Sequence, residues 1–320
     1  MSTVLVLAGG PDAEHEVSIN SAGAIVKALR ESGTHEVHHH VIAKNEAVEF
    51  ERTLASLPGD VIFPALHGLW GEGGPLQDLL EADARPYVGS GPAAARLAMD
   101  KVSTKLHAAA LGIPTAVSAI LGPVPCGGPD RCPLPLPVVL KPTHEGSSVG
   151  LYLCYSDADW ASARDTAMAD SRATGRSYLI ERLVGGIELT VPLLGSDEGS
   201  GPIRALPVIQ ITPADGTYDY AAKYTRGDTV YTVEPDLADG VTARLQRDAV
   251  ALAERLGVRH LARVDFMLPA DGDWAGVPQL LEANTMPGFT STSLLPKAAA
   301  HTGMGFAALC DHLVHLAETP

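Results

Sequence analysis

Residues 138–150 read VVLKPTHEGSSVG, a short apolar run followed by a lysine and a turn rich in glycine and serine. The run Val138–Leu140 predicts a strand that ends in Lys141. Glycine backbone can turn its N–H groups toward an anion, and the hydroxyls of Ser147 and Ser148 add donors. Because the lysine precedes the glycines, the stretch is not a Walker phosphate loop. By itself it is equally consistent with phosphate binding and with a hairpin turn that carries a surface lysine.

A second set of polar residues lies in two apolar runs further along the chain, Arg263-Val264-Asp265-Phe266 and Leu281–Thr285. If both runs are strands, Glu282 and Asn284 are two apart and point to the same face. With Asp265 from a neighbouring strand they would supply carboxylate and amide oxygens, which suit a Mg²⁺ ion that bridges nucleotide phosphates. Arg263 shares the face of Asp265 and could hold a developing negative charge. The competing interpretation is a set of surface ion pairs at strand ends.

The N-terminal part of the chain alternates strands and helices, with Gly9-Gly10 directly after the first strand. This order indicates a parallel α/β layer. The expected elements are Val4–Ala8, Ser18–Glu31, Val61–Leu66 and Gly74–Ala84. The tract His38–His40 is expected on an exposed strand end, where its side chains split between two faces and form no metal site.

The rest of the chain mixes helices and strands, which indicates an α+β organisation. One long helix is expected from Pro92 to Leu111, because Gly112 and Pro114 are stop signals, and Leu121–Pro137 reads as a loop. Other helices are expected at Asp157–Ser171, at Asp239–Leu256 and near the C-terminus. The expected strands are Val138–Leu140, Leu151–Tyr155, Tyr178–Leu183, Glu188–Leu194, Ile203–Ile211, Val230–Val233, Ala262–Leu268 and Gln279–Glu282.

Composition narrows the class of protein. The chain has 320 residues, with 23 Lys and Arg against 38 Asp and Glu, so its net charge is 23 − 38 = −15. This sign argues against binding of duplex nucleic acid, which needs a surplus of Lys and Arg to neutralise phosphates. Apolar runs are strand-sized, and the N-terminus lacks the pattern of a signal peptide. The four cysteines, at positions 126, 132, 154 and 310, are too few for a disulfide framework, so we expect a reduced, cytoplasmic protein.

Three weaker patterns complete the set. Glu14-His15-Glu16 follows the first strand at a helix N-terminus. The segment is equally consistent with a ligand-binding site and with an ordinary helix cap that has acidic residues in its first turn. His67 ends a buried strand, and a single histidine there is more often structural than catalytic. The segment Tyr218–Tyr224 places three tyrosines and Lys223 in an expected loop, which by itself indicates no function.

Taken in order, the motifs resemble the D-alanine–D-alanine ligases of the ATP-grasp superfamily. From residue 9 to residue 296 the chain reads GGPDAEHEVSINS, ALHGLWGEGGPLQ, YVGSG and MDK, VVLKPTHEGSSVG, LIERLVGGIE, YDYAAKY, RVDF and LEANTMPGFTSTSLLP. The resemblance implies three α/β domains, here residues 1–91, 92–186 and 187–320. It also implies that ATP lies between antiparallel sheets of the second and third domains, beside an N-terminal parallel layer that binds substrate.

The resemblance implies roles for the nucleotide-binding residues. Lys101, Lys141 and Ser148 are expected at the ATP phosphates, and Lys223 at the γ-phosphate. The residues expected to line the adenine are Glu181, Arg182, Leu183 and Val184, with Glu188 on the ribose. The expected ligands of Mg²⁺ or Mn²⁺, two ions per active site, are Asp265, Glu282 and Asn284.

It also implies roles in substrate binding and catalysis. Glu14 would hold the ammonium group of the first D-alanine, and Ser147 and Tyr224 would join it in a hydrogen-bonded set. Arg263 would stabilise the oxyanion. The carboxylate of the second D-alanine would lie in a pocket formed by Gly288, Ser293 and Leu294, with His67 nearby.

The expected activity is the ATP-dependent ligation of two D-alanines through an acyl phosphate, for peptidoglycan precursors. Because that intermediate hydrolyses in water, we expect a closing lid at Tyr218–Val230. The expected assembly is a cytoplasmic homodimer whose ligands are small molecules, without nucleic acid or membrane. Two alternatives are a ligase for another acceptor, such as D-lactate, and a silent nucleotide-binding paralogue. Glu72-Gly73-Gly74 departs from the Glu-Asp-Gly that the family usually has, and Trp70 is bulky there, which bears on acceptor affinity.

Overall fold

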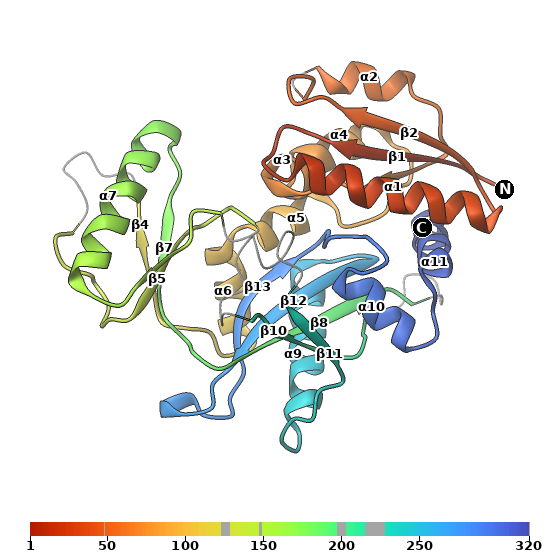
Figure 1. Ribbon diagram of the computed structural model, residues 1–320. Coiled ribbons are helices and arrows are strands. Elements are labelled where there is room, and N and C mark those ends of the chain that lie inside the picture. Colours follow the sequence, from red (N-terminus) through yellow and green to blue (C-terminus); the bar gives the residue numbers. More distant parts are fainter. Residues whose placement is uncertain (48, 123–128, 147–148, 197–202, 215–227, 320) are drawn as a thin grey trace.

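The computed structural model describes residues 1–47, 49–122, 129–146, 149–196, 203–214 and 228–319. Its N-terminal part is a three-stranded parallel sheet in the order β2-β1-β3 (Figure 1). The strands are β1 (Thr3–Gly9), β2 (Glu36–Ile42) and β3 (Val61–Pro64), and the helices are α1 (His15–Ser32), α2 (Phe50–Ser56), α3 (Gly68–Glu72) and α4 (Pro75–Asp83). The predicted parallel layer is therefore confirmed.

Both faces of this sheet are covered, which explains why its central strand is a continuous apolar run. Val4, Val6 and Ala8 belong to one buried cluster, together with side chains of α1 and of the C-terminal helix. Leu5 and Leu7 belong to another, together with side chains of α2 and α4. β2 pairs with one neighbour, and its histidines are half-buried or exposed, as predicted from the alternation.

The predicted helix from Pro92 to Leu111 is in fact two helices, α5 (Pro92–Met99) and α6 (Lys101–Ala110). Asp100 separates them with extended backbone, and its side chain accepts a hydrogen bond from Val102 N at 2.9 Å, so it is the N-cap of α6. Apolar periodicity continues across the break, and the periodicity alone therefore concealed it. The break makes Lys101 the first residue of α6.

The next unit is a four-stranded antiparallel sheet in the order β4-β7-β5-β6 with helix α7 (Asp157–Thr174) on one face (Figure 1). Val138, Leu140 and Ile180 face α7 and form a core with Trp160. Alternation along the strands sends Lys141 and Glu181 to the opposite face. The strands are β4 (Ser118–Leu121), β5 (Val138–Pro142), β6 (Tyr152–Cys154) and β7 (Tyr178–Arg182).

The C-terminal part is built on a six-stranded antiparallel sheet, β11-β10-β8-β12-β13, with β9 paired to β8. Its strands are β8 (Ile187–Leu194), β9 (Arg204–Ala205), β10 (Ile209–Thr212), β11 (Val230–Val233), β12 (Leu261–Leu268) and β13 (Gln279–Asn284), with a short 3₁₀ turn η1 (Gly272–Trp274) between the last two. The predicted single strand over Ile203–Ile211 is wrong. Pro207, which has no N–H for a sheet ladder, lies between the two short strands.

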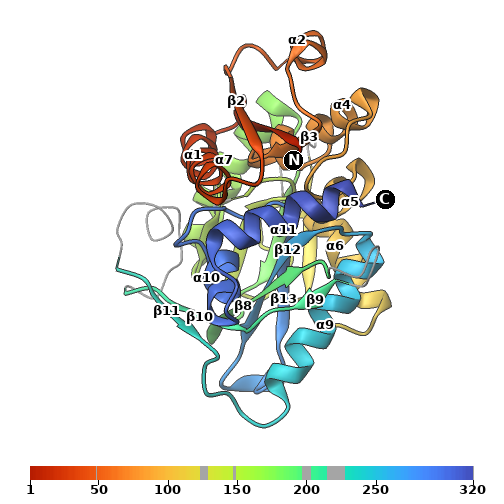
Figure 2. The same ribbon diagram turned by 90° about the vertical axis from the view of Figure 1, so that its right-hand side faces the viewer.

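The described residues of this part also form the helices α9 (Val241–Leu256), α10 (Leu294–His301) and α11 (Phe306–Glu318). α9 packs on one face of the large sheet, while α10 and α11 lie between that sheet and α1 (Figure 2). The two ends of the chain meet, since Ser2 Oγ donates a hydrogen bond to Glu318. In the part of the chain that the structure describes, no helix is long and apolar enough to cross a bilayer.

Candidate active site between the two antiparallel sheets

Lys101 connects the helix break to the glycine turn after β5. Its backbone N donates to Thr143 O at 3.0 Å, and its Nζ donates to Glu145 O at 2.5 Å. The same Nζ lies 3.3 Å from Glu282 Oε2 on β13. One buried ammonium group therefore joins the four-stranded sheet, the six-stranded sheet and the start of α6.

Lys141 belongs to a buried charge cluster on the face of the small sheet opposite α7. Glu181 accepts from Lys105 Nζ at 2.6 Å with one carboxylate oxygen, and the other lies 2.5 Å from Lys141 Nζ. All three residues are less than a tenth exposed. Burial alone would raise the pKa of Glu181, but the ammonium groups of Lys141 and Lys105 hold it below its usual value. Burial would likewise lower the pKa of Lys141, and the carboxylates of Glu181 and Glu282 raise it instead.

The second sequence motif forms one polar face on β12 and β13. Asp265 is directly opposite Glu282, and Arg263 is directly opposite Asn284. Glu282 and Asn284 share this face because they are two residues apart on β13, and Phe266, the neighbour of Asp265, turns to the core under α9. A β-bulge shifts the register directly after Asp265. The sequence prediction that these four side chains lie together is confirmed.

The pairs within this face are close. Arg263 donates two hydrogen bonds to Asp265, at 2.9 Å from Nε to Oδ1 and 2.9 Å from Nη2 to Oδ2. Thr190 Oγ1 on β8 donates to Asp265 Oδ1 at 2.5 Å. Asn284 Oδ1 accepts from Met286 N at 2.9 Å, which fixes the turn that follows β13.

The donor chemistry of this face fits a hard divalent cation. Two carboxylates and one amide supply oxygen ligands, which Mg²⁺ prefers. The residues that the structure describes contain no group of three or more His, Cys, Asp or Glu side chains that could hold a metal ion by themselves. A cation here would therefore need further oxygens from phosphate or water.

The N-terminal unit closes the other side of the site with buried acidic groups. Glu14, at the start of α1, is 7% exposed, and a side chain built at Gly146 would come within 3.3 Å of its carboxylate. Glu72, at the end of α3, accepts from Gly68 N at 3.1 Å. Burial, and then the charge of Glu14, raise the pKa of Glu72 well above its usual range. Glu72, Lys101, Glu145, Gly146, Glu282 and Asn284 all line one small cavity.

His67 lies between this acidic group and the turn after β13. Its ring nitrogens are 3.1 Å from Met286 O and 3.3 Å from Ser21 Oγ, and burial lowers its pKa, so the ring is neutral near pH 7. Phe289 N donates to the same Ser21 hydroxyl at 3.3 Å. The turn continues to Ser293, the N-cap of α10, whose Oγ accepts from Thr290 N at 3.0 Å. Gly288 is close to it, since a Cβ there would lie 3.6 Å from Ser293 Oγ.

Comparison with known proteins agrees with this arrangement. The family model described as D-ala D-ala ligase C-terminus matches residues 131–315. The D-alanine–D-alanine ligase of Anaeromyxobacter dehalogenans (strain 2CP-C) is 39% identical over 313 residues, which cover 97% of this chain and 95% of that protein. The chain belongs to the D-alanine–D-alanine ligase family. The corresponding ligase of Bordetella petrii is 41% identical over 98% of this chain and 91% of its own length.

Solved structures of the family show the same fold. The D-alanine–D-alanine ligase of Bacillus anthracis, solved in complex with ATP, has a TM-score of 0.77 and 25% identity, covering 99% of this chain and 97% of that one. The fold of this chain is therefore the ATP-grasp fold, with a parallel N-terminal layer and two antiparallel sheets. ATP use and small-molecule substrates follow from membership of this family.

The structure brings together most of the residues that the family motifs single out. Glu14, His67, Arg263, Gly288 and Ser293 lie on the side of the N-terminal unit and the turn after β13. Leu294, the first residue of α10, is buried behind Ser293. Lys101 lies at the start of α6, Lys141 and Glu181 on the face of the small sheet opposite α7, and Asp265, Glu282 and Asn284 on β12 and β13.

Other expected residues lie at the edge of this group or outside the described ranges. Arg182 ends β7 and places its guanidinium 5.5 Å from the centre of the Trp274 ring, followed in the chain by Leu183 and Val184. Glu188 is the second residue of β8 and lies opposite Met267 of β12. The described residues do not include Ser147, Ser148, Lys223 or Tyr224, nor the expected lid apart from its last three residues, 228–230.

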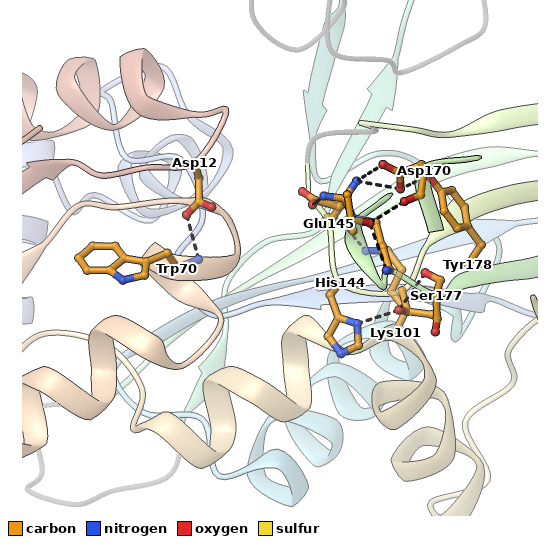
Figure 3. A network of polar contacts seen from close by, with 11 residues as sticks. Asp12, Trp70, Lys101, His144, Glu145, Asp170, Ser177 and Tyr178 are labelled. Carbon is orange, nitrogen blue, oxygen red and sulfur yellow. Dashed lines mark hydrogen bonds and ion pairs between the residues drawn. The ribbon is translucent and has the colours of Figure 1, made fainter. Parts of the chain in front are cut away.

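Sequence reasoning missed several residues that build the site. Lys105 carried no motif, because its role depends on a partner in another strand. Asp12 was overlooked, although it lies inside the first glycine motif. Its Oδ2 accepts from Trp70 N at 2.9 Å and Gly71 N at 3.2 Å, so it caps α3 (Figure 3). A short acidic residue just after a strand and a glycine pair is a usable signal for such a cap.

Proposed function

We propose that the chain joins two molecules of D-alanine into D-alanyl-D-alanine, coupled to the conversion of ATP to ADP and phosphate, as a step in peptidoglycan synthesis. One observation carries this proposal: the polar face of Arg263, Asp265, Glu282 and Asn284 lies beside Lys101, between the two antiparallel sheets. Curated relatives of about two-fifths identity over nearly the whole chain bear the same activity in their names.

The chemistry requires an activated carboxylate. The carboxylate of the first D-alanine is a poor electrophile, so it takes the γ-phosphoryl group of ATP and becomes an acyl phosphate. The amine of the second D-alanine then attacks the carbonyl carbon, and inorganic phosphate leaves. Lys101, Lys141 and Lys223 would neutralise charge on the phosphates, and Arg263 would stabilise the oxyanion at the carbonyl.

Substrate positions follow from the buried groups around the site. Glu14 would bind the ammonium group of the first D-alanine, and Ser147 and Tyr224 would form a hydrogen-bonded set with Glu14. Ser293 and Leu294 are at the N-terminus of α10, where backbone N–H groups favour a carboxylate, and Gly288 would leave room for it. The neutral ring of His67 lies near this second position. Glu181, Arg182, Leu183 and Val184 would line the adenine, Glu188 would contact the ribose, and Ser148 the phosphates.

Asp265, Glu282 and Asn284 have the oxygen ligands that Mg²⁺ or Mn²⁺ would need. When bound there, two such ions would offset phosphate charge during transfer. We also propose a division into residues 1–91, 92–186 and 187–320, a homodimeric assembly and a cytoplasmic location. The segment 218–230 is proposed as the lid that excludes water from the acyl phosphate.

A phosphate-release assay tests the activity. Phosphate release from ATP should depend on D-alanine, and chromatography should show one dipeptide formed per phosphate released. Replacement of D-alanine as acceptor by D-lactate should give far less product, because Tyr224 is present. Binding of ATP without alanine-dependent phosphate release would show that the chain is a silent nucleotide-binding paralogue.

A further inference from the structure

A polar network outside the proposed ATP contacts holds Thr143 and Glu145, which follow β5. Arg176 Nη2 lies 2.6 Å from the Glu145 carboxylate, and Nη1 lies 3.2 Å from Asp170 Oδ2. Tyr178 OH donates to the same Asp170 oxygen at 2.8 Å (Figure 3). The guanidinium thus joins the end of α7 to the turn.

The local backbone explains how Arg176 reaches the turn. Gly175 ends α7 in the left-handed region, at φ 78°, and its N–H donates to Ser171 O at 2.8 Å. Ser171 Oγ donates to Arg176 O at 2.6 Å, and Thr143 N donates to Ser177 O at 3.0 Å. The residues around Arg176 are therefore held on both sides, next to the first residues of the turn.

Glu145 connects this network to the site. Its carbonyl accepts from Lys101 Nζ at 2.5 Å, and it lines the cavity that also contains Glu72 and Glu282. The carboxylate of Glu145 also acts on Asp12: burial raises the pKa of Asp12, and the charges of Glu145 and Glu14 raise it further. Without its guanidinium partner, Glu145 would be an uncompensated negative charge in the region where the nucleotide phosphates are proposed to bind.

We propose that Arg176 is a positioning residue for ATP: it neutralises Glu145 and holds that residue, whose carbonyl accepts from Lys101 Nζ, in place. This inference takes from the proposed function only that the bound nucleotide is ATP. Arg176 itself touches neither the phosphates nor the reacting atoms. Because the pair is part-exposed, at 33% and 19%, its contribution is moderate and not that of a fully buried pair.

The test compares ATP binding and steady-state kinetics across matched variants. Arg176→Ala should raise both the ATP Kd and the ATP KM by about five- to twentyfold, as expected for loss of a charge-assisted hydrogen bond. The kcat and the KM for D-alanine should change little, because ground-state binding of ATP is what weakens. Arg176→Lys, which keeps the charge but not the fork between Glu145 and Asp170, should give an intermediate value.

Two further variants separate positioning from general structure. Glu145→Gln in the Arg176→Ala background removes the uncompensated charge and should restore most of the ATP affinity. Arg164→Ala is the control, because Arg164 lies on α7 and is ion-paired, at 2.8 Å, to Asp165, a residue of the exposed side of that helix that is not part of the Glu145 network. It should leave the ATP affinity unchanged.

Three results would overturn the inference: an unchanged ATP Kd in Arg176→Ala, no recovery on adding Glu145→Gln, or an equal loss in Arg164→Ala. Thermal unfolding is measured for each variant, and if Arg176→Ala does not fold, Arg176→Lys alone must show the rise in ATP Kd. Calorimetric ATP binding needs no turnover. Failure of the wild-type chain to make dipeptide would therefore refute the proposed function and leave this test intact.

Discussion

Replacement of Glu181 by Gln should destabilise the protein far more than replacement of Lys105 by Met. The native cluster holds two buried ammonium groups and one buried carboxylate, a net charge of +1. Glu181→Gln leaves both cations without their common counter-ion, whereas Lys105→Met leaves the Lys141–Glu181 pair matched. The first substitution thus raises the net charge of the cluster to +2, and the second lowers it to zero.

The structure sets the expected sizes. Removal of one member of a buried ion pair typically costs about 3–5 kcal/mol, and Lys141 has Glu181 as its close carboxylate at 2.5 Å. Lys105 keeps Thr115 Oγ1 at 2.6 Å and Ala116 O at 2.7 Å, so the main cost of Glu181→Gln arises at Lys141. For Lys105→Met we expect a loss of about 1–2 kcal/mol, from acceptors that lose their donor.

Urea unfolding followed by tryptophan fluorescence is a suitable assay, because Trp160 is buried in the core of the same four-stranded sheet. The pH dependence has a definite sign. The folded pKa of Glu181 is below its usual value of 4.5, so its stabilisation is complete above that pH and is lost as the pH falls through the lowered value. The difference in the free energy of unfolding between the wild-type chain and Glu181→Gln should therefore become smaller at acidic pH.

The reasoning would be refuted by equal unfolding midpoints for the wild-type chain and Glu181→Gln at pH 7. A larger loss in Lys105→Met than in Glu181→Gln would also refute it, since the order of the two follows from charge balance alone.

Three further predictions concern the site itself. Glu282→Ala should lower turnover by at least about a hundredfold with the fold retained; a circular dichroism melt checks the fold, and full activity per folded molecule would indicate a purely structural ion pair. Asp12→Ala should raise the KM for D-alanine by about fivefold, because loss of a helix cap costs about 1 kcal/mol and loosens α3, while Asp12→Asn, which keeps an acceptor oxygen, should recover most of it. Tyr224→Phe should make D-lactate a detectable acceptor, most clearly at low pH, where the amine of D-alanine is protonated; an unchanged ratio of depsipeptide to dipeptide between pH 6 and 9 would assign acceptor choice elsewhere.

Alternation and motif order predicted much of this molecule. The two-residue spacing of Glu282 and Asn284 was enough to place both on one face of their strand, and the same holds for Arg263 and Asp265, because strand geometry is local. The apolar run at Val4–Ala8 likewise predicted a strand of the parallel layer. These inferences needed no knowledge of distant contacts.

Other features depend on distant contacts and could not be read from local pattern. Lys105 and Glu181 are far apart in sequence and meet only when α6 packs beside β7. Arg176 and Glu145 are paired across a turn and a helix end, and neither lies at a position that periodicity distinguishes. The helix break at Asp100 was readable as an N-cap, but the continuous apolar spacing on both sides favoured one helix.

The pairing of the site's cations leads to a last prediction, on the order of metal and nucleotide binding. The cations expected to attract ATP already have carboxylate partners: Arg263 holds Asp265, and Lys101 lies beside Glu282. A divalent ion that binds alone must displace Arg263 and Lys101 from Asp265 and Glu282, the carboxylates proposed as its ligands. An ion that arrives with ATP brings phosphate oxygens that can accept the displaced ammonium and guanidinium groups.

We therefore expect the metal to bind weakly without nucleotide, with an affinity for Mn²⁺ at least about tenfold lower than in the presence of a non-hydrolysable ATP analogue. Electron paramagnetic resonance of free Mn²⁺ measures both affinities. Lys101→Met should reduce the difference between the two Mn²⁺ affinities, because the metal then no longer has to displace the Lys101 ammonium group from Glu282. Equal Mn²⁺ affinity with and without the analogue would show that these ion pairs present no barrier to the metal, and that Asp265 and Glu282 are available to it in the free enzyme.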